Sequence, residues 1–168
     1  MSPHYDEVFH TVVARAEQDE SIGKAEIGAL VPWKRLNAST KWALALMQTP
    51  DGEVRAATGA AYAAARNRGK SIFDAAFTAR GALSALPGFG SGDALASAII
   101  CALAPTRMAV YDRRAQAGLQ RLELTLTPKS GRHARYMKLL EQLGAEVAAA
   151  GTPMSAREID TALYQLGG

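Results

Sequence analysis

The chain has 168 residues, which is enough to bury a core and fits one domain. Its composition, 48% hydrophobic and 21% charged, excludes a largely disordered chain. Alanine is abundant and strand-favouring residues are sparse, so we expect an all-α fold. The single cysteine, Cys101, excludes an internal disulfide and an all-cysteine metal site, and we expect it to pack in the core.

Two helices are predicted before residue 35. The first covers residues 3–18, with Val8, Val12 and Ala16 on its buried stripe. The second covers residues 24–30 and should end before Pro32, because proline has no amide hydrogen to continue a helix. The acidic first helix contains no continuous apolar run, and no run of about 18 apolar residues exists elsewhere. We therefore expect a cytoplasmic protein with no membrane partner.

Polar residues mark the starts of the next helices. Ser39 or Thr40 is expected to open the third helix. A turn then leads into an alanine-rich helix over residues 53–67, with Thr49 as its cap and Pro50 at its first position. Ser71 and Asp74 have the spacing of a capping box and should begin a helix lined by apolar residues. A further helix is predicted over residues 93–103, ended by Pro105.

The last third of the chain predicts three more helices. Asp112 stands where a helix over residues 113–122 should begin, because aspartate is a favoured N-cap. The alternating leucines at the end of this helix are interpreted as helix end and loop rather than as a strand. A helix over 132–149 follows, and Ser155 with Glu158 forms a capping box for the last helix.

Basic residues are concentrated in the segment 106–138. It holds eight arginines and lysines against two acids, whereas residues 1–30 hold six acids against two basic residues. Such a segment is what a phosphate-facing surface requires, because release of counterions drives binding to a polyanion. A solvated helix face explains the same residues equally well.

A glycine-rich turn joins the helices at 71–83 and 93–103, so that residues 71–104 have the pattern of a helix-hairpin-helix motif. Its sequence is Leu86-Pro87-Gly88-Phe89-Gly90. Leu86 and Phe89 can anchor the turn to the core, and the glycines permit positive φ and close approach of another molecule. The amides of Gly88, Gly90 and Ser91 would then be unpaired donors that attract a phosphate. A plain corner between two helices is the structural alternative.

This turn and the aspartate that follows it resemble the helix-hairpin-helix superfamily of base-excision DNA glycosylases. In that superfamily a glycine-rich hairpin is followed, one helix later, by the catalytic aspartate; here Gly90 and Asp112 are 22 residues apart. The resemblance covers roughly residues 71–122. The segment 155–164 is similar, more weakly, to the last helix of the 8-oxoguanine glycosylase branch.

The resemblance implies a two-lobed helical fold within one domain, residues 1–168, and a DNA repair enzyme. The hairpin of the family holds a phosphate of double-stranded DNA through backbone amides, often with a monovalent cation on its carbonyls and with no other cofactor. The damaged base is extruded into a pocket, because its glycosidic bond is unreachable inside the stack. Asp112 would stabilise the developing positive charge of the sugar or orient water. Arg113 and Arg114 flank it and are candidates for phosphate contacts.

Two departures from the family limit the implied chemistry. Members that also cut the strand carry a lysine two residues after the last hairpin glycine, where it forms a Schiff base. Gly92 stands there in this chain, so we expect a monofunctional hydrolase or a protein that has lost activity. Asp93 would repel a phosphate unless its carboxylate points away. The four-cysteine cluster of some members is absent.

Four aromatic residues are candidates for stacking on an extruded base: Trp33, Trp42, Phe73 and Phe77. Each is also a candidate core residue. The leading hypothesis is a DNA N-glycosylase that acts as a monomer. The alternatives are a non-catalytic DNA-binding protein that uses the hairpin as a phosphate clamp, and a scaffold for protein interaction.

Overall fold

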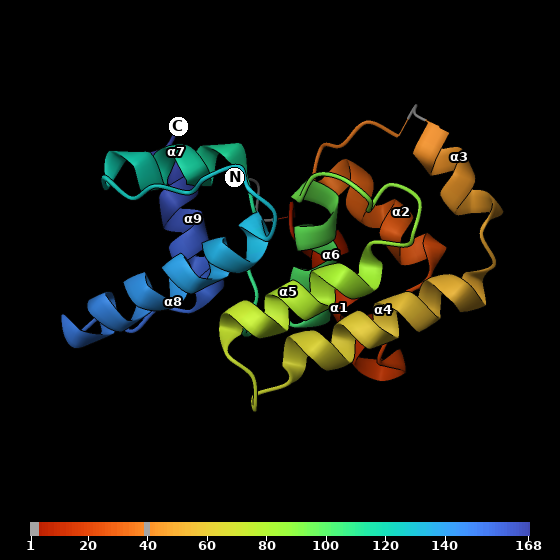
Figure 1. The fold of residues 1–168 in the computed structure, drawn as a ribbon, viewed down its shortest axis with the longest axis horizontal. Coiled ribbons are helices and arrows are strands. Elements are labelled where there is room, and N and C mark those ends of the chain that lie inside the picture. The colour runs from red at the N-terminus through yellow and green to blue at the C-terminus, as the bar shows by residue number, and fades with distance from the viewer. Residues whose placement is uncertain (1–3, 39–40) are drawn as a thin grey trace.

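The computed structural model describes residues 4–38 and 41–168, and within these ranges the chain is all-helical, as predicted (Figure 1). Nine helices lie in the described part of the chain: α1 (Glu7–Asp19), α2 (Lys24–Trp33), α3 (Lys41–Gln48), α4 (Asp51–Arg66), α5 (Ile72–Leu83), α6 (Ala94–Leu103), α7 (Arg113–Arg121), α8 (Arg132–Ala149) and α9 (Ala156–Leu166). None of these helices has both the length and the apolar character that crossing a membrane requires.

The helices form two groups. In Figure 1, α7, α8 and α9 lie together on one side of the molecule, and α1 to α6 lie on the other. Helix α8 packs against α5, and this contact joins the groups. Buried side chains from both groups belong to one hydrophobic core. The arrangement is therefore two-lobed in outline.

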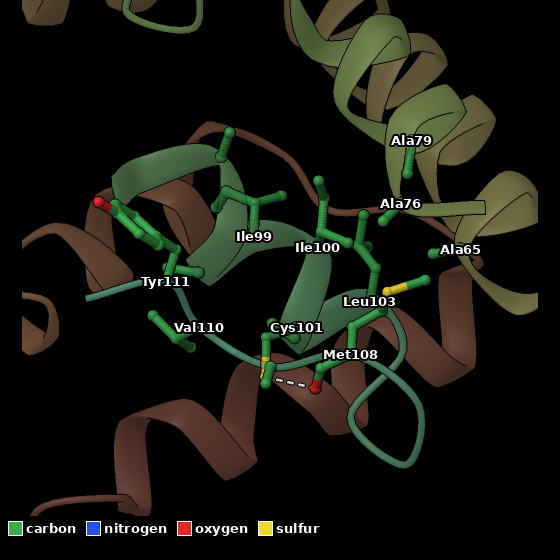
Figure 2. Packing of buried hydrophobic residues seen from close by; sticks show 14 of the residues in the cluster. Ala65, Ala76, Ala79, Ile99, Ile100, Cys101, Leu103, Met108, Val110 and Tyr111 are labelled. Carbon is green, nitrogen blue, oxygen red and sulfur yellow. Dashed lines mark hydrogen bonds between the residues drawn. The ribbon is translucent and has the colours of Figure 1, made fainter. Parts of the chain in front are cut away.

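Helix α6 is the centre of the core because it is apolar on every side, and a helix of that kind is stable only when surrounded. All residues from Leu95 to Leu103 are buried, including Cys101 as expected. The Cys101 thiol donates a hydrogen bond to the carbonyl oxygen of Met108, at 3.2 Å (Figure 2). The segment from Met108 to Tyr111 is buried and lies beside α6. This segment carries the chain from the core to Asp112.

Most of the predicted helix starts are confirmed. Ser71 accepts a hydrogen bond from the Asp74 amide at the start of α5. Ser155 and Glu158 form the predicted capping box of α9. The helix over 132–149 is confirmed with its bounds, and the leucines after α7 lie in turn and loop rather than in a strand. Local side-chain capping is thus a sufficient signal for these starts.

Some details near the amino terminus differ from the predictions. Helix α1 begins at Glu7, and Phe9 takes the buried position while Val8 is 44% exposed. Pro32 lies inside α2, although the helix was expected to end before it. The proline is tolerated because it stands in the last turn, where the amide of Lys34 still bonds to the carbonyl of Leu30. Pro50 precedes α4 instead of starting it. The prediction of a helix start at Ser39 or Thr40 lies outside the described residues.

Helices α7 and α9 pack so closely that their backbones nearly touch. A Cβ added to Gly118 would lie 2.2 Å from the carbonyl oxygen of Leu163. Only glycine permits this approach without displacement of one helix. The contact fixes the position of α9 relative to the amino-terminal end of α7, where Asp112 lies.

Candidate functional site

Hydrogen bonds on both sides of the segment 108–112 position Asp112. The amide of Tyr111 donates to the Ser97 hydroxyl of α6, at 3.0 Å. The Nε2 atom of His133, in α8, lies 3.1 Å from the carbonyl oxygen of Ala109. His133 is only 1% exposed, so its side chain has a structural role. An extended segment held from both helices leaves Asp112 little positional freedom.

Asp112 is the N-cap of α7, as predicted. Its Oδ1 atom accepts a hydrogen bond from the amide of Arg114 at 2.8 Å. Its Oδ2 atom lies 2.5 Å from Nζ of Lys34, which follows α2 in sequence. The side chain of Asp112 is 30% exposed and that of Lys34 is 11% exposed. The carboxylate therefore has a lysine partner that no local sequence pattern indicates.

Opposing effects act on the pKa of Asp112. Burial raises this pKa and is the largest single effect, but the hydrogen bonds from Lys34 and from the Arg114 amide oppose it, and the net result is a pKa below its ordinary value. The positive charges of Lys34 and Arg114 act in the same direction. Asp112 is consequently ionised at neutral pH, which is the state needed to stabilise a positive charge.

A cavity of about 120 Å³ opens beside Asp112. Its walls come from the segment before α1, the end of α2, the 108–112 segment and one face of α9. The lining residues are Tyr5, Asp6, Trp33, Lys34, Arg35, Val110, Asp112, Arg157, Asp160, Thr161 and Tyr164. The cavity thus combines aromatic surface with a few polar and ionisable groups, as small-molecule sites commonly do.

Besides Asp6 and Asp112, a third carboxyl group, that of Asp160 in α9, lines the same cavity. The Tyr136 hydroxyl donates a hydrogen bond to it. Burial raises the pKa of Asp160 to about 6, although the hydrogen bond from Tyr136 and the charges of Lys34 and Arg157 lower it. The cavity therefore holds two carboxyl groups with opposite shifts from the ordinary pKa of aspartate.

Of the four aromatic residues considered for a base pocket, the structure brings only Trp33 to this cavity. Its ring is stacked on Phe9, with centroids 4.8 Å apart. Trp42 instead covers the glycine-rich turn, and Phe73 and Phe77 stack on each other beside α8. These three residues do not line the Asp112 cavity, because the faces of α3 and α5 that bear them point elsewhere.

The loop of residues 84–93 connects α5 and α6 and contains the glycine-rich turn. Gly88 has a φ of +90°, and a Cβ there would lie 2.5 Å from the Trp42 ring. Phe89 is fully buried, so its side chain anchors the turn and is not a DNA contact. Gly90 and Ser91 are exposed. Among the hydrogen bonds of the described residues, none uses the amides of Gly88, Gly90 or Ser91 as donors.

A second cavity, of about 360 Å³, separates this loop from the start of α8. Gly90, Ser91 and Lys129 are among its lining residues, and Gly131, the N-cap of α8, provides no side-chain cap for the first amides of that helix. Asp93 also lines this cavity, but its carboxylate oxygens lie 3.4 Å from Nε of Arg80 and 3.2 Å from Nε of Arg132. The two arginines neutralise the charge that was expected to repel a phosphate.

Four of the eight basic residues of the 106–138 segment have side-chain partners within the protein. The guanidinium groups of Arg107 and Arg135 donate to backbone carbonyl oxygens. Arg132 pairs with Asp93, and Arg114 lies over the ring of Tyr164 at 4.3 Å. The remaining four are the exposed Arg113, Arg121, Lys129 and Lys138, and no side-chain hydrogen bond or ion pair of theirs is found within the described chain. The charge count of the sequence therefore overstates the surface that can meet a polyanion.

The residues missed by sequence reasoning are Lys34, Arg157, Asp160 and Tyr164. Lys34 and Asp112 are 78 residues apart in the chain, so no spacing rule connects them. The other three residues could have been grouped from the sequence. Positions 157, 160 and 164 are three and four residues apart, so they share one face of α9. The same face carries the polar wall of the cavity.

Comparison of the chain with protein-family models, with curated proteins and with solved structures finds no match. Within residues 4–38 and 41–168 there is no group of three or more histidine, cysteine, aspartate or glutamate side chains placed to hold a metal ion.

Proposed function

We propose that the protein is a DNA repair glycosylase that hydrolyses the N-glycosidic bond of a damaged base. The observation that carries the proposal is the position of Asp112: an ionised, partly exposed carboxylate at the wall of a cavity that also contains aromatic rings. Cleavage of a glycosidic bond leaves positive charge on the sugar, and a fixed carboxylate stabilises that charge. The extruded base would occupy the cavity.

The 84–93 loop supports the DNA-binding part of the proposal. As the turn of a helix-hairpin-helix motif, it would hold one phosphate through the unpaired amides of Gly90 and Ser91. Lys129 lies across the same cavity with an exposed side chain, and the Asp93 charge is already paired. A monovalent cation on the carbonyls of this turn stays a prediction.

We expect binding to duplex DNA to depend on Lys129. Lys129→Gln should weaken binding about equally for every duplex and should reduce the slope of log affinity against log salt by about 1, because one phosphate contact is lost. Fluorescence anisotropy at several salt concentrations measures both quantities. Lys70→Gln, which removes an exposed lysine between α4 and α5, is the matched control and should keep the slope of the unaltered chain. Equal slopes for all three proteins would contradict a phosphate site in this cavity.

The reaction is tested with duplexes that each carry one damaged base. We expect free base and an abasic site that becomes a strand break only after alkali, because Gly92 replaces the lysine of strand-cutting enzymes. Borohydride should trap no covalent adduct of protein and DNA. A trapped adduct would overturn the monofunctional expectation. If Lys34→Gln abolished that adduct, the amine that attacks the sugar would be that of Lys34, the lysine in contact with Asp112.

A non-catalytic DNA-binding protein is the second candidate. It is favoured by the separation of the two sites, because the Asp112 cavity and the cavity of the 84–93 loop have no lining residue in common. This function predicts salt-sensitive binding with no base released from any duplex. Base release by the unaltered chain would exclude it.

A further inference from the structure

Three carboxyl groups line the Asp112 cavity. Asp6 is paired with Arg157, whereas the pKa values of Asp112 and Asp160 are shifted in opposite directions. Asp112 is paired with Lys34 and with the amide of Arg114, which stabilise its negative charge. Asp160 is more deeply buried and shares its hydrogen bond with the Tyr136 hydroxyl. Where two neighbouring carboxyl groups have environments that separate their pKa values, one is suited to act as an acid and the other as an ion.

The groups that face Asp160 come from five parts of the fold. Lys34 follows α2, Cys101 lies in α6, Asp112 precedes α7, Tyr136 lies in α8 and Arg157 lies in α9. Two of them are cations, and their charges favour ionised Asp160. Burial opposes them and is the largest of these effects, so the pKa of Asp160 is raised to about 6.

We propose that Asp160 is the general acid of this site, which donates its proton to the departing base while Asp112 remains ionised and faces the sugar. This role rests on the proposed glycosylase function. Under this proposal α9 supplies the proton donor, a role that neither the glycine-rich turn nor the position of Asp112 implies.

The proposed step conserves atoms and charge. The bond between the sugar C1′ and the base nitrogen breaks, and its electron pair leaves with the base. The Asp160 proton moves to the base, which departs neutral. Water adds its oxygen to C1′ and gives up a proton, which Asp112 accepts and passes to solvent. Asp160 regains a proton from solvent, so the net reaction consumes one water.

The pH dependence of base release tests this role. Under single-turnover conditions with saturating protein, the rate for the unaltered chain should fall about tenfold per pH unit above the pKa of Asp160, because the acid is then ionised. Asp160→Asn should be about 100-fold slower at pH 5 and should lose this dependence on pH. Asparagine keeps a carbonyl oxygen that can accept the bond from Tyr136. DNA binding measured at each pH separates a change in rate from a change in affinity.

Tyr136→Phe supplies a second, directional test. The hydrogen bond from Tyr136 lowers the pKa of Asp160, so its removal should move the fall in rate to higher pH. Tyr136 is fully buried, does not line the cavity and differs from phenylalanine by one hydroxyl. Asp74→Asn, in the exposed first turn of α5, is the matched control and should reproduce the profile of the unaltered chain.

Stability gives a readout that is independent of catalysis. The folded protein raises the pKa of Asp160 above the ordinary value of 3.8, so the stabilisation by the protonated carboxyl is complete below that value and is lost as the pH rises through about 6. The melting temperature of the unaltered chain should therefore fall relative to that of Asp160→Asn between pH 4 and pH 7. A constant difference would show that Asp160 holds no proton in this range.

The outcomes separate the two proposals. Base release with the same pH profile in the unaltered chain and in Asp160→Asn overturns the role of Asp160 and leaves the glycosylase function standing. Failure of the unaltered chain to release base from any duplex overturns the glycosylase function, and the acid role falls with it. A lost pH dependence in Asp160→Asn, with an upward shift in Tyr136→Phe, supports both.

Discussion

Asp112→Asn is expected to lower the rate of base release by at least about 100-fold, because an uncharged amide cannot stabilise the positive sugar or accept a proton from water. The fold should be retained. Asparagine is as good an N-cap as aspartate, so the hydrogen bond to the Arg114 amide can still form. The loss of rate would therefore report on chemistry and not on unfolding.

The measurement compares single-turnover base release by the two proteins on the same damaged duplex, with abasic sites revealed by alkali. DNA affinity should change little, because Asp112 lies outside the cavity of the 84–93 loop. Asp74→Asn makes the same chemical change outside both cavities and should leave the rate unaltered. Equal release by the unaltered chain and Asp112→Asn would remove this carboxylate from the mechanism.

Gly118→Ala is expected to have the largest effect on stability. The new methyl group would lie 2.2 Å from the Leu163 carbonyl oxygen, so α7 and α9 must separate. Overpacking of this kind costs about 1–3 kcal/mol, and we expect the upper end because the obstructing atoms are backbone. For a chain of this length that cost lowers the melting temperature by roughly 6–12 °C.

Thermal and urea unfolding followed by circular dichroism measure this change. Gly28→Ala, in the exposed middle of α2, has no atom within 4 Å of the added Cβ and is the matched control. It should stabilise the protein by about 0.4–1 kcal/mol, because alanine has less freedom than glycine in the unfolded chain. Unfolding of Gly118→Ala at the same urea concentration as the unaltered chain would show that the helices can separate without cost.

The separation of α7 and α9 would also disturb the candidate site. Asp112 caps α7 and Asp160 lies one turn before Leu163 on α9, so the two carboxyl groups are held at a distance that Gly118 helps to set. A stability defect at Gly118 should therefore be accompanied by slower base release even where the protein remains folded.

The sequence alone determined the local structure of this protein. Ser71, Asp112 and Ser155 were identified as helix starts because a capping bond joins residues only two or three positions apart. The bounds of α8 followed from the spacing of its apolar residues, and the burial of Cys101 followed from the apolar run around it. Of the two turn glycines predicted to permit positive φ, Gly88 adopts it and Gly90 does not.

Only the tertiary structure decided which side chains share a cavity. It placed Lys34 against Asp112 and Asp160 beside both, excluded Phe73, Phe77 and Trp42 from that cavity, and buried Phe89. It also gave four arginines of the basic segment partners within the protein, among them Arg107 and Arg135. The physical reason is range: capping and periodicity act over one helical turn, whereas the convergence of distant side chains depends on how whole helices pack.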